Sequence, residues 1–523
     1  MKKYINDIDV WKTPRIDEES DFVYEAQCLN GPGEKNWDID ILKSSNIARK
    51  TGDKVTDFKV NVQSYECGSG IILPIFKKKN VNTRTAALKI VKDFYRGETK
   101  DKAHPWAEME SFMKYQHYCA EMGYDIVGCE IGCCMSGYPV NMAFSRGAAR
   151  QFGKSWFADF SLWGAGTEGI CGNMLNYSGN FYAFNGWGEA KVCDPTGGQG
   201  VNAVRRSHLY VYMSGASWLI NEAGGNNAFY PEVEEDGYYR LTPHGEVFKA
   251  NNRFFKKNPD RGIMYTPFAL VLDYYHGLPF GLWNGNSVFE SIEPNTADYM
   301  TQNILSMLYP HWNEYAILAK NQLTSTPFGD TADVILQNAS QKVLNSYPVL
   351  ILSGDIVFEK AEIEKYKCYV DNGGVLVMNS IYLEFFPEFK KDTDQKKYEV
   401  PFGNGRVIVY GDDYSIDELP SIMTELCKEF VPFEVSGDVQ YLMNVKDNSI
   451  ILTILNNNGV TKESDKFEVF DENETQNITV KYTGNDSIVK INEILKEETL
   501  SNSDVQNITL KPGDITIIEY TFQ

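Results

Sequence analysis

The chain has 523 residues, of which 43% are hydrophobic and 23% are charged. This mix is typical of globular proteins and argues against wholesale disorder, collagen and coiled coil. Asp and Glu number 71 against 50 Lys and Arg, which gives a formal charge of -21. A field of that sign repels nucleic acid and anionic membrane surfaces, but it does not repel a neutral sugar. We therefore expect neither nucleic acid nor a membrane as a partner.

The amino-terminal segment and the cysteines indicate a cytoplasmic protein. No apolar run is long enough to span a bilayer, and residues 1–9 have two lysines without the apolar stretch of a secretory signal. The ten cysteines fit no disulfide or zinc template, although Cys129, Cys133 and Cys134 crowd one segment. We interpret them as reduced structural thiols, and we expect neither a metal nor a cofactor.

Residues 1–258 alternate predicted strands and helices and hold most of the Trp, Cys and Gly. Three predicted strands end in acidic residues, and a predicted helix lies between each strand and the next. The strands cover residues 125–132, 155–164 and 216–225, and the helices cover residues 141–152 and 203–214. Strand and helix in this order predict a (β/α)8-type barrel, in which the carboxyl ends of all strands meet at one mouth.

The amino-terminal side of this predicted barrel is short of strands. Before residue 125 the pattern supplies only residues 21–24, 56–62 and 71–76 as candidates. We therefore expect a barrel that is incomplete, or built from short elements, on that side.

Residues 259–432 have the pattern of a doubly wound, flavodoxin- or amidotransferase-like α/β domain. Residues 263–272 form a nearly continuous apolar run that predicts a strand buried on both faces. Four further strands are predicted at 333–336, 349–352, 375–378 and 405–410, with a helix at 360–370. Nucleotide-binding glycine motifs are missing at the turns, and Ser353-Gly354-Asp355 stands where an amidotransferase would carry its cysteine. We interpret this domain as a scaffold or assembly domain.

Residues 433–523 predict an antiparallel β-sandwich. Residues 449–455 and 477–482 are predicted strands that end at Asn- and Gly-rich turns. Residues 508–520 predict a hairpin whose turn is Pro512-Gly513.

Three carboxylates at strand ends are the candidate catalytic residues, namely Glu130, Asp159 and Glu222. Two carboxylates at a barrel mouth are the minimum that glycoside hydrolysis needs, one as general acid and the other as base or nucleophile. Each also has a structural interpretation, because an acid at a strand end often caps the next helix. We assign the catalytic pair to Glu222 and Glu130, with Asp159 beside them.

Residues 164–200 form a long loop rich in Gly, Asn and aromatic residues, and loops of this length are uncommon unless functional. Aromatic rings stack on sugar faces while amides bond the hydroxyls. The predicted substrate-binding residues are therefore Trp163, Tyr182, Trp187, Asn221 and His208. The alternatives are loop packing for the aromatic residues and helix capping for His208. Arg146 and Arg150 lie four apart on one helix and are interpreted as salt-bridge residues.

The order of the three parts resembles the family-42 β-galactosidases, which join a barrel, an amidotransferase-like sheet and a β-sandwich. The resemblance covers about residues 200–523, and it is carried by the segments 210–218, 245–255, 268–274 and 370–377. It implies a sugar-cleaving hydrolase whose middle sheet builds trimers, so we expect a homo-oligomer, dimer or trimer.

Two departures from that family stand in the sequence. Asn221-Glu222 looks like the family's acid/base pair, but it falls on the eighth strand rather than the fourth, with Glu130 on the sixth and Asp159 on the seventh. The front of the barrel is also short. We therefore predict a glycoside hydrolase acting on a carbohydrate, and we keep two alternatives. One is a non-catalytic glycan-binding or scaffold protein descended from such an enzyme, and the other is a metal-dependent hydrolase using Cys, Glu and His. The predicted domains are 1–258, 259–432 and 433–523.

Overall fold

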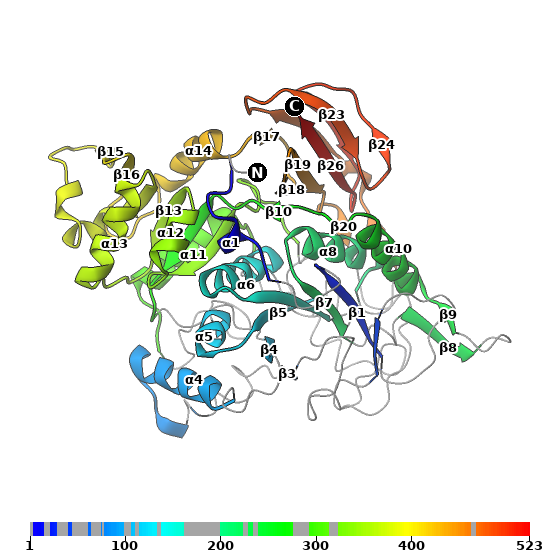
Figure 1. Cartoon of the computed structure of the whole chain (residues 1–523), viewed down its shortest axis with the longest axis horizontal. Helices are drawn as coiled ribbons and strands as arrows, with labels where there is room; N and C mark the ends of the chain where they lie inside the picture. Colours follow the sequence, from blue (N-terminus) through cyan, green and yellow to red (C-terminus); the bar gives the residue numbers. More distant parts are fainter. Residues whose placement is uncertain are drawn as a thin grey trace.

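The computed structural model shows a mixed α/β protein with two parallel sheets followed by an antiparallel region (Figure 1). Among the described residues, no helix is long and apolar enough to cross a membrane. The structure describes residues 4–14, 21–28, 40–43, 61–63, 75, 78–98, 106–109, 115–132, 137–161, 199–222, 228–233, 239–275, 292–312, 323–461 and 467–523.

The first sheet has seven parallel strands in the order β2-β1-β7-β6-β5-β4-β3. Read from β1, this is the cyclic order of a barrel, because the last strand, β7, pairs back onto the first. Among the described residues no hydrogen bonds join β2 to β3, so a complete barrel is not shown. The strands are β1 (Val23–Cys28), β2 (Asp40–Lys43), β3 (Asn61–Gln63), β4 (Trp106–Met109), β5 (Ile126–Gly132), β6 (Ser155–Ser161) and β7 (Trp218–Glu222).

Helices between these strands cover the sheet, as parallel strands require. A small antiparallel pair, β8 with β9, precedes the last helix of this part. The elements are α1 (Ile8–Trp11), α4 (Arg84–Glu98), α5 (Tyr115–Met122), α6 (Tyr138–Phe152), α8 (Val201–Met213), β8 (Phe229–Val233), β9 (Tyr239–Leu241) and α10 (Pro243–Lys257). The predicted strands and helices after residue 125 are confirmed to within a few residues.

The front of the chain differs from the sequence prediction. β2 and β4 were not predicted, and Ile75, the residue described within 71–76, is helical rather than extended. Short strands of three or four residues leave too little alternation to identify from one sequence.

The second sheet has the order β12-β11-β13-β14-β16-β15, with only β15 antiparallel to its neighbour. The four strands predicted after residue 330 are confirmed, and Gly373, with φ of 107°, ends the predicted helix α13. The elements are β11 (Phe268–Leu272), α11 (Thr296–Leu308), β12 (Ala332–Leu336), α12 (Gln341–Ser346), β13 (Val349–Ser353), α13 (Lys360–Asp371), β14 (Val375–Asn379), the short 3-10 helices η2 (Ser380–Glu384) and η3 (Pro387–Phe389), β15 (Lys397–Phe402), β16 (Gly405–Tyr410) and α14 (Leu419–Phe430).

The prediction of one strand over residues 263–272 is wrong. The run is divided into β10 (Ile263–Met264) and β11, and β10 pairs with β18 of the third region instead of the middle sheet. Pro267 lies between the two strands, and proline has no N–H to donate to a sheet. An apolar run alone therefore did not show which sheet its residues join.

The third region contains two larger antiparallel sheets, of order β10-β18-β19-β26-β23-β24 and β17-β22-β25, and the two-stranded pair of β20 with β21. The predicted hairpin around Pro512-Gly513 is wrong, because β25 pairs with β22 whereas β26 pairs with β19 and β23. The turn instead carries the chain from one sheet to the other. The remaining elements are β17 (Phe433–Val435), β18 (Gln440–Lys446), β19 (Ser449–Leu455), β20 (Val460–Thr461), β21 (Val469–Phe470), the 3-10 helix η4 (Glu472–Glu474), β22 (Gln476–Tyr482), β23 (Ile488–Glu493), β24 (Glu498–Thr499), β25 (Val505–Leu510) and β26 (Ile515–Phe522).

Helix α6 joins the first sheet to the second (Figure 1). A Cβ atom at Gly147 would lie 1.7 Å from the carbonyl oxygen of Val334, so only glycine permits this approach of α6 to β12. Arg146 and Arg150 are the predicted salt-bridge residues, and both bind Asp333 of β12. These ion pairs connect the two sheets rather than the barrel to itself.

The aspartates at this junction have opposite pKa shifts. Burial alone would raise the pKa of Asp333, but Arg150 and Arg146 outweigh burial and hold this pKa below its usual value. Burial raises the pKa of Asp330, and Arg146 and the hydroxyls of Tyr210 and Tyr309 offset that rise only in part. Asp333 is therefore the carboxylate that holds the two arginine side chains in place.

Candidate functional site

The register of the first sheet brings two of the predicted acids together. Glu130 of β5 is paired with Asp159 of β6, and Asp159 is paired with Ile220 of β7. Residues paired across parallel strands share a face of the sheet, about 4.8 Å from strand to strand. The predicted acids Glu130 and Asp159 are thus direct neighbours on one face, although 29 positions separate them in the sequence.

Glu222 occupies a position on the same face, one layer further toward the carboxyl end. It is the last residue of β7, two positions beyond Ile220, and it is paired with Ser161. Its backbone is described, whereas its side chain lies outside the described residues. The sequence prediction that Glu130, Asp159 and Glu222 gather at one end of the sheet agrees with this backbone placement.

An apolar layer lies beneath the acids. The rings of Phe157 and Trp218, paired residues of β6 and β7, are 5.1 Å apart. The ring of Phe157 also covers Gly128, where a Cβ atom would lie 2.2 Å from it. This layer closes the sheet's interior on the amino side of Glu130 and Asp159, as stacked side-chain layers do in parallel barrels.

Both acids are buried, with exposed fractions of 5% for Glu130 and 3% for Asp159. Glycoside hydrolysis needs two carboxyl groups at one site, one as general acid and the other as base or nucleophile. The row of acids can therefore support general acid–base chemistry.

The opposite face of β5 carries Cys129, which is not suited to nucleophilic chemistry. Burial raises the pKa of the Cys129 thiol to about 12, and the charges of Asp159 and Glu130 act in the same direction. A thiol with this pKa stays protonated at neutral pH. Within the part of the chain that the structure describes, no group of three or more His, Cys, Asp or Glu is placed to hold a metal ion.

Asn221 and His208, predicted to bind substrate, lie on the helix side of β7. The Tyr24 hydroxyl lies 2.8 Å from His208 Nδ1 and also bonds Asn221. Burial lowers the pKa of His208 to about 3, so this imidazole is neutral. The contact ties β1, β7 and α8 together, which gives both residues a structural role; substrate contact by either stays a prediction.

The three aromatic residues predicted to stack on sugar, Trp163, Tyr182 and Trp187, lie outside the described residues. Their roles remain predictions.

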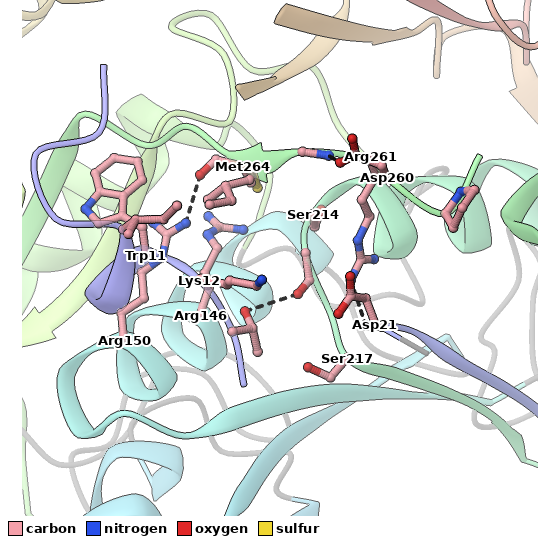
Figure 2. Close-up of a pocket in the computed structure, with 16 residues that line it drawn as sticks. Trp11, Lys12, Asp21, Arg146, Arg150, Ser214, Ser217, Asp260, Arg261 and Met264 are labelled. Atoms are coloured by element: carbon pink, nitrogen blue, oxygen red, sulfur yellow. Dashed lines mark hydrogen bonds between the residues drawn. The ribbon is translucent and has the colours of Figure 1, made fainter. Parts of the chain in front are cut away.

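A cavity that the sequence did not predict lies at the other end of the sheet (Figure 2). It lies where residues just before β1 and β7 meet α1, α6 and the segment 259–264. Its volume is about 160 Å³. The cationic residues that line it are far apart in the sequence, so no local pattern predicts the cavity. The only such residues close together in the sequence are Arg146 and Arg150, four positions apart on one helix.

Several solved structures are similar to this chain. The β-galactosidase of Bacillus circulans sp. alkalophilus is 11% identical over 88% of this chain and 69% of its own, with a TM-score of 0.49. The family-42 β-galactosidase of G. stearothermophilus is 11% identical over 84% and 68%, with a TM-score of 0.48. The α-L-fucosidase isoenzyme 2 of Paenibacillus thiaminolyticus is 12% identical over 88% and 76%, with a TM-score of 0.46. No protein-family model and no curated protein sequence matches the chain.

Proposed function

We propose that the chain is a glycoside hydrolase whose carboxylates act at the carboxyl end of the first sheet. The observation that carries the proposal is the register of β5 and β6, which puts Glu130 beside Asp159 on a buried face. Apolar residues and uncharged pairs are the ordinary contents of such a layer. Two adjacent acids near the carboxyl end of a parallel sheet, where the active sites of barrel enzymes lie, support a chemical role.

Glu222 and Glu130 are the proposed catalytic pair, one acting as the general acid and the other as the base or nucleophile. Asp159 lies between them in the row. Asp159 is suited to bond a substrate hydroxyl or to tune the proton of Glu130. Since the chain resembles family-42 β-galactosidases in the order of its parts, aryl β-galactosides are the first substrates to try, followed by other aryl glycosides and oligosaccharides.

Two pairings of these acids predict different stereochemistry. Glu130 and Asp159 lie on adjacent strands, about 4.8 Å apart, a spacing near the ~5 Å that retaining enzymes use. Glu130 and Glu222 are separated by two strand intervals and by two residues along the strand, so their backbones lie roughly 12 Å apart, which leaves room for the water of an inverting enzyme. The anomer released first, measured by NMR, distinguishes the two pairings.

The central experiment is Glu222→Gln, with turnover measured on the aryl glycoside that the wild type cleaves fastest. We expect a loss of at least ~100-fold, the usual size of a general acid–base contribution. Glu246→Gln on the exposed surface of α10 is the matched control and should leave turnover unchanged. Full activity of Glu222→Gln would remove Glu222 from the proposal.

The competing function is glycan binding without catalysis. It predicts saturable sugar binding and no turnover by the wild type across the whole panel. The same panel therefore decides between the two functions before any variant is made.

The division into domains 1–258, 259–432 and 433–523 is part of the proposal. The three sheet regions support it, with the exception that β10 crosses into the third region. The expected dimer or trimer is tested by sedimentation velocity of the full chain.

A further inference from the structure

The cavity at the amino end of the first sheet has a charge opposite to that of the whole chain. Four cationic residues and two aspartates line it, whereas the chain as a whole has a formal charge of -21. Figure 2 shows Lys12 on the same side as Arg146 and Arg150, with Arg261 and Asp21 on the other side. The lining cations are Lys12, Arg146, Arg150 and Arg261, and the aspartates are Asp21 and Asp260.

The four cations are not equally neutralised. Arg146 and Arg150 have Asp333 as a common ion-pair partner, and Asp260 is paired with Lys446 at 3.5 Å. Among the described residues neither Lys12 nor Arg261 forms an ion pair. Lys12 is exposed at the cavity, so its ammonium is available to a ligand.

Arg261 is the less usual of these two residues. Its exposed fraction is only 8%, and its hydrogen bonds go to main-chain carbonyls, those of Tyr212, Ala216 and Asp21. Burial lowers the pKa of Arg261, and the nearby Tyr212 and Asp21 offset that fall only in part. Buried charges in proteins are normally paired with an opposite charge. A further negative charge in the cavity, in addition to that of Asp21, would balance the charge of Arg261 more fully.

Two further polar groups lie in the cavity wall. The Ser214 hydroxyl and Nη1 of Arg146 are both buried, and no hydrogen-bond partner for either occurs among the described residues. Buried polar groups in folded proteins nearly always have a partner from protein, water or ligand. A cavity of about 160 Å³ has room for such a ligand.

We propose that this cavity is a binding site for a small multivalent oxyanion, held by Lys12, Arg261 and the Ser214 hydroxyl. The chemistry is that shared by phosphate monoesters and dicarboxylates. Because α1, α6 and the segment 259–264 all contribute to the wall, the bound anion would fasten the amino-terminal segment to the junction of the three sheet regions. The site is at the opposite end of the sheet from Glu130 and Asp159, so it stands independently of the proposed hydrolase activity.

The test uses isothermal titration of the full chain with inorganic phosphate and with malonate, against chloride at matched ionic strength. We expect saturable binding of at least one oxyanion at one site per chain. Tighter binding of phosphate assigns a phosphate-bearing ligand, and tighter binding of malonate assigns a dicarboxylate. Absence of saturable binding of both probes overturns the proposal.

Variants localise the binding. Lys12→Ala should weaken the oxyanion about tenfold, the usual value of one charge-assisted hydrogen bond. Ser214→Ala, which removes a hydroxyl without a described partner, should weaken it to a smaller extent. Lys428→Ala removes the same charge from the exposed end of α14 and should leave the affinity unchanged. Equal affinities of Lys12→Ala and wild type, or equal losses in Lys12→Ala and Lys428→Ala, would overturn the proposal.

Discussion

The two ends of the first sheet carry opposite charges and are built differently. Toward the carboxyl end, Glu130 and Asp159 sit side by side on strands that are neighbours in both sequence and space. At the amino end, the cations of the cavity come from α1, α6 and the segment 259–264. The acid row depends on strand register alone, whereas the cationic cavity exists only where separate parts of the chain meet. Changes at the first end should therefore affect chemistry, and changes at the second end should affect assembly of the fold.

The largest expected effect on stability is at the amino end. Asp333→Ala removes the common partner of Arg146 and Arg150 and leaves two buried guanidinium groups without their main carboxylate. Breaking a buried ion pair in this way costs about 3–5 kcal/mol. Urea unfolding should show that loss, whereas Asp412→Ala, at an exposed position, should change the free energy of unfolding by less than about 0.5 kcal/mol.

The largest expected effect on chemistry is at the carboxyl end. Glu130→Gln keeps the shape of the side chain and removes its charge, so turnover should fall by about 100-fold or more. Asp125→Asn makes the matched change just before β5, at the partly exposed opposite end of the same strand. Its turnover should stay within about twofold of the wild type, judged by the small value of exposed ion pairs. Equal losses in the two variants would contradict the assignment of chemistry to one end.

An intermediate effect is expected on acid stability. His208 is neutral in the fold because burial lowers its pKa to about 3, whereas an unfolded histidine titrates near 6.5. Protonation therefore favours the unfolded chain, and stability falls as pH drops from 6.5 toward 3. At pH 5 this residue alone should account for a loss of about 2 kcal/mol relative to pH 7. His208→Gln should show a shallower loss between pH 7 and pH 5 in urea unfolding.

The smallest effect is expected at the contact behind β7. Tyr24→Phe removes the hydroxyl that lies 2.8 Å from His208 Nδ1 and should cost about 1 kcal/mol of stability. Because His208 remains, the pH dependence of unfolding should keep the slope of the wild type. A slope as shallow as that of His208→Gln would show that the tyrosine, and not burial, sets the charge state of the histidine.

Local patterns in the sequence were sufficient for much of the fold. Apolar runs bounded by Gly and polar residues predicted β5, β6, β13 and β14, and Gly373 predicted the end of α13. These features are local, because they depend on side-chain periodicity and on backbone angles within a few residues.

The same patterns failed where pairing partners are distant. Residues 263–272 and 508–520 have the composition of strands, yet each range is shared between two sheets. Strand propensity reports that a residue fits a half-buried sheet surface, not which strand lies beside it.

For the candidate site, too, the sequence predicted some features and only the tertiary structure showed the others. From the sequence alone, Glu130, Asp159 and Glu222 could be selected as acids at strand ends, because each follows an apolar run. Only the tertiary structure decided that Glu130 and Asp159 are paired, that Asn221 lies on the other face, and that Lys12 shares a cavity with Arg261. The physical reason is that register and domain contacts are set by long-range burial, which brings together residues whose separation in the chain carries no signal.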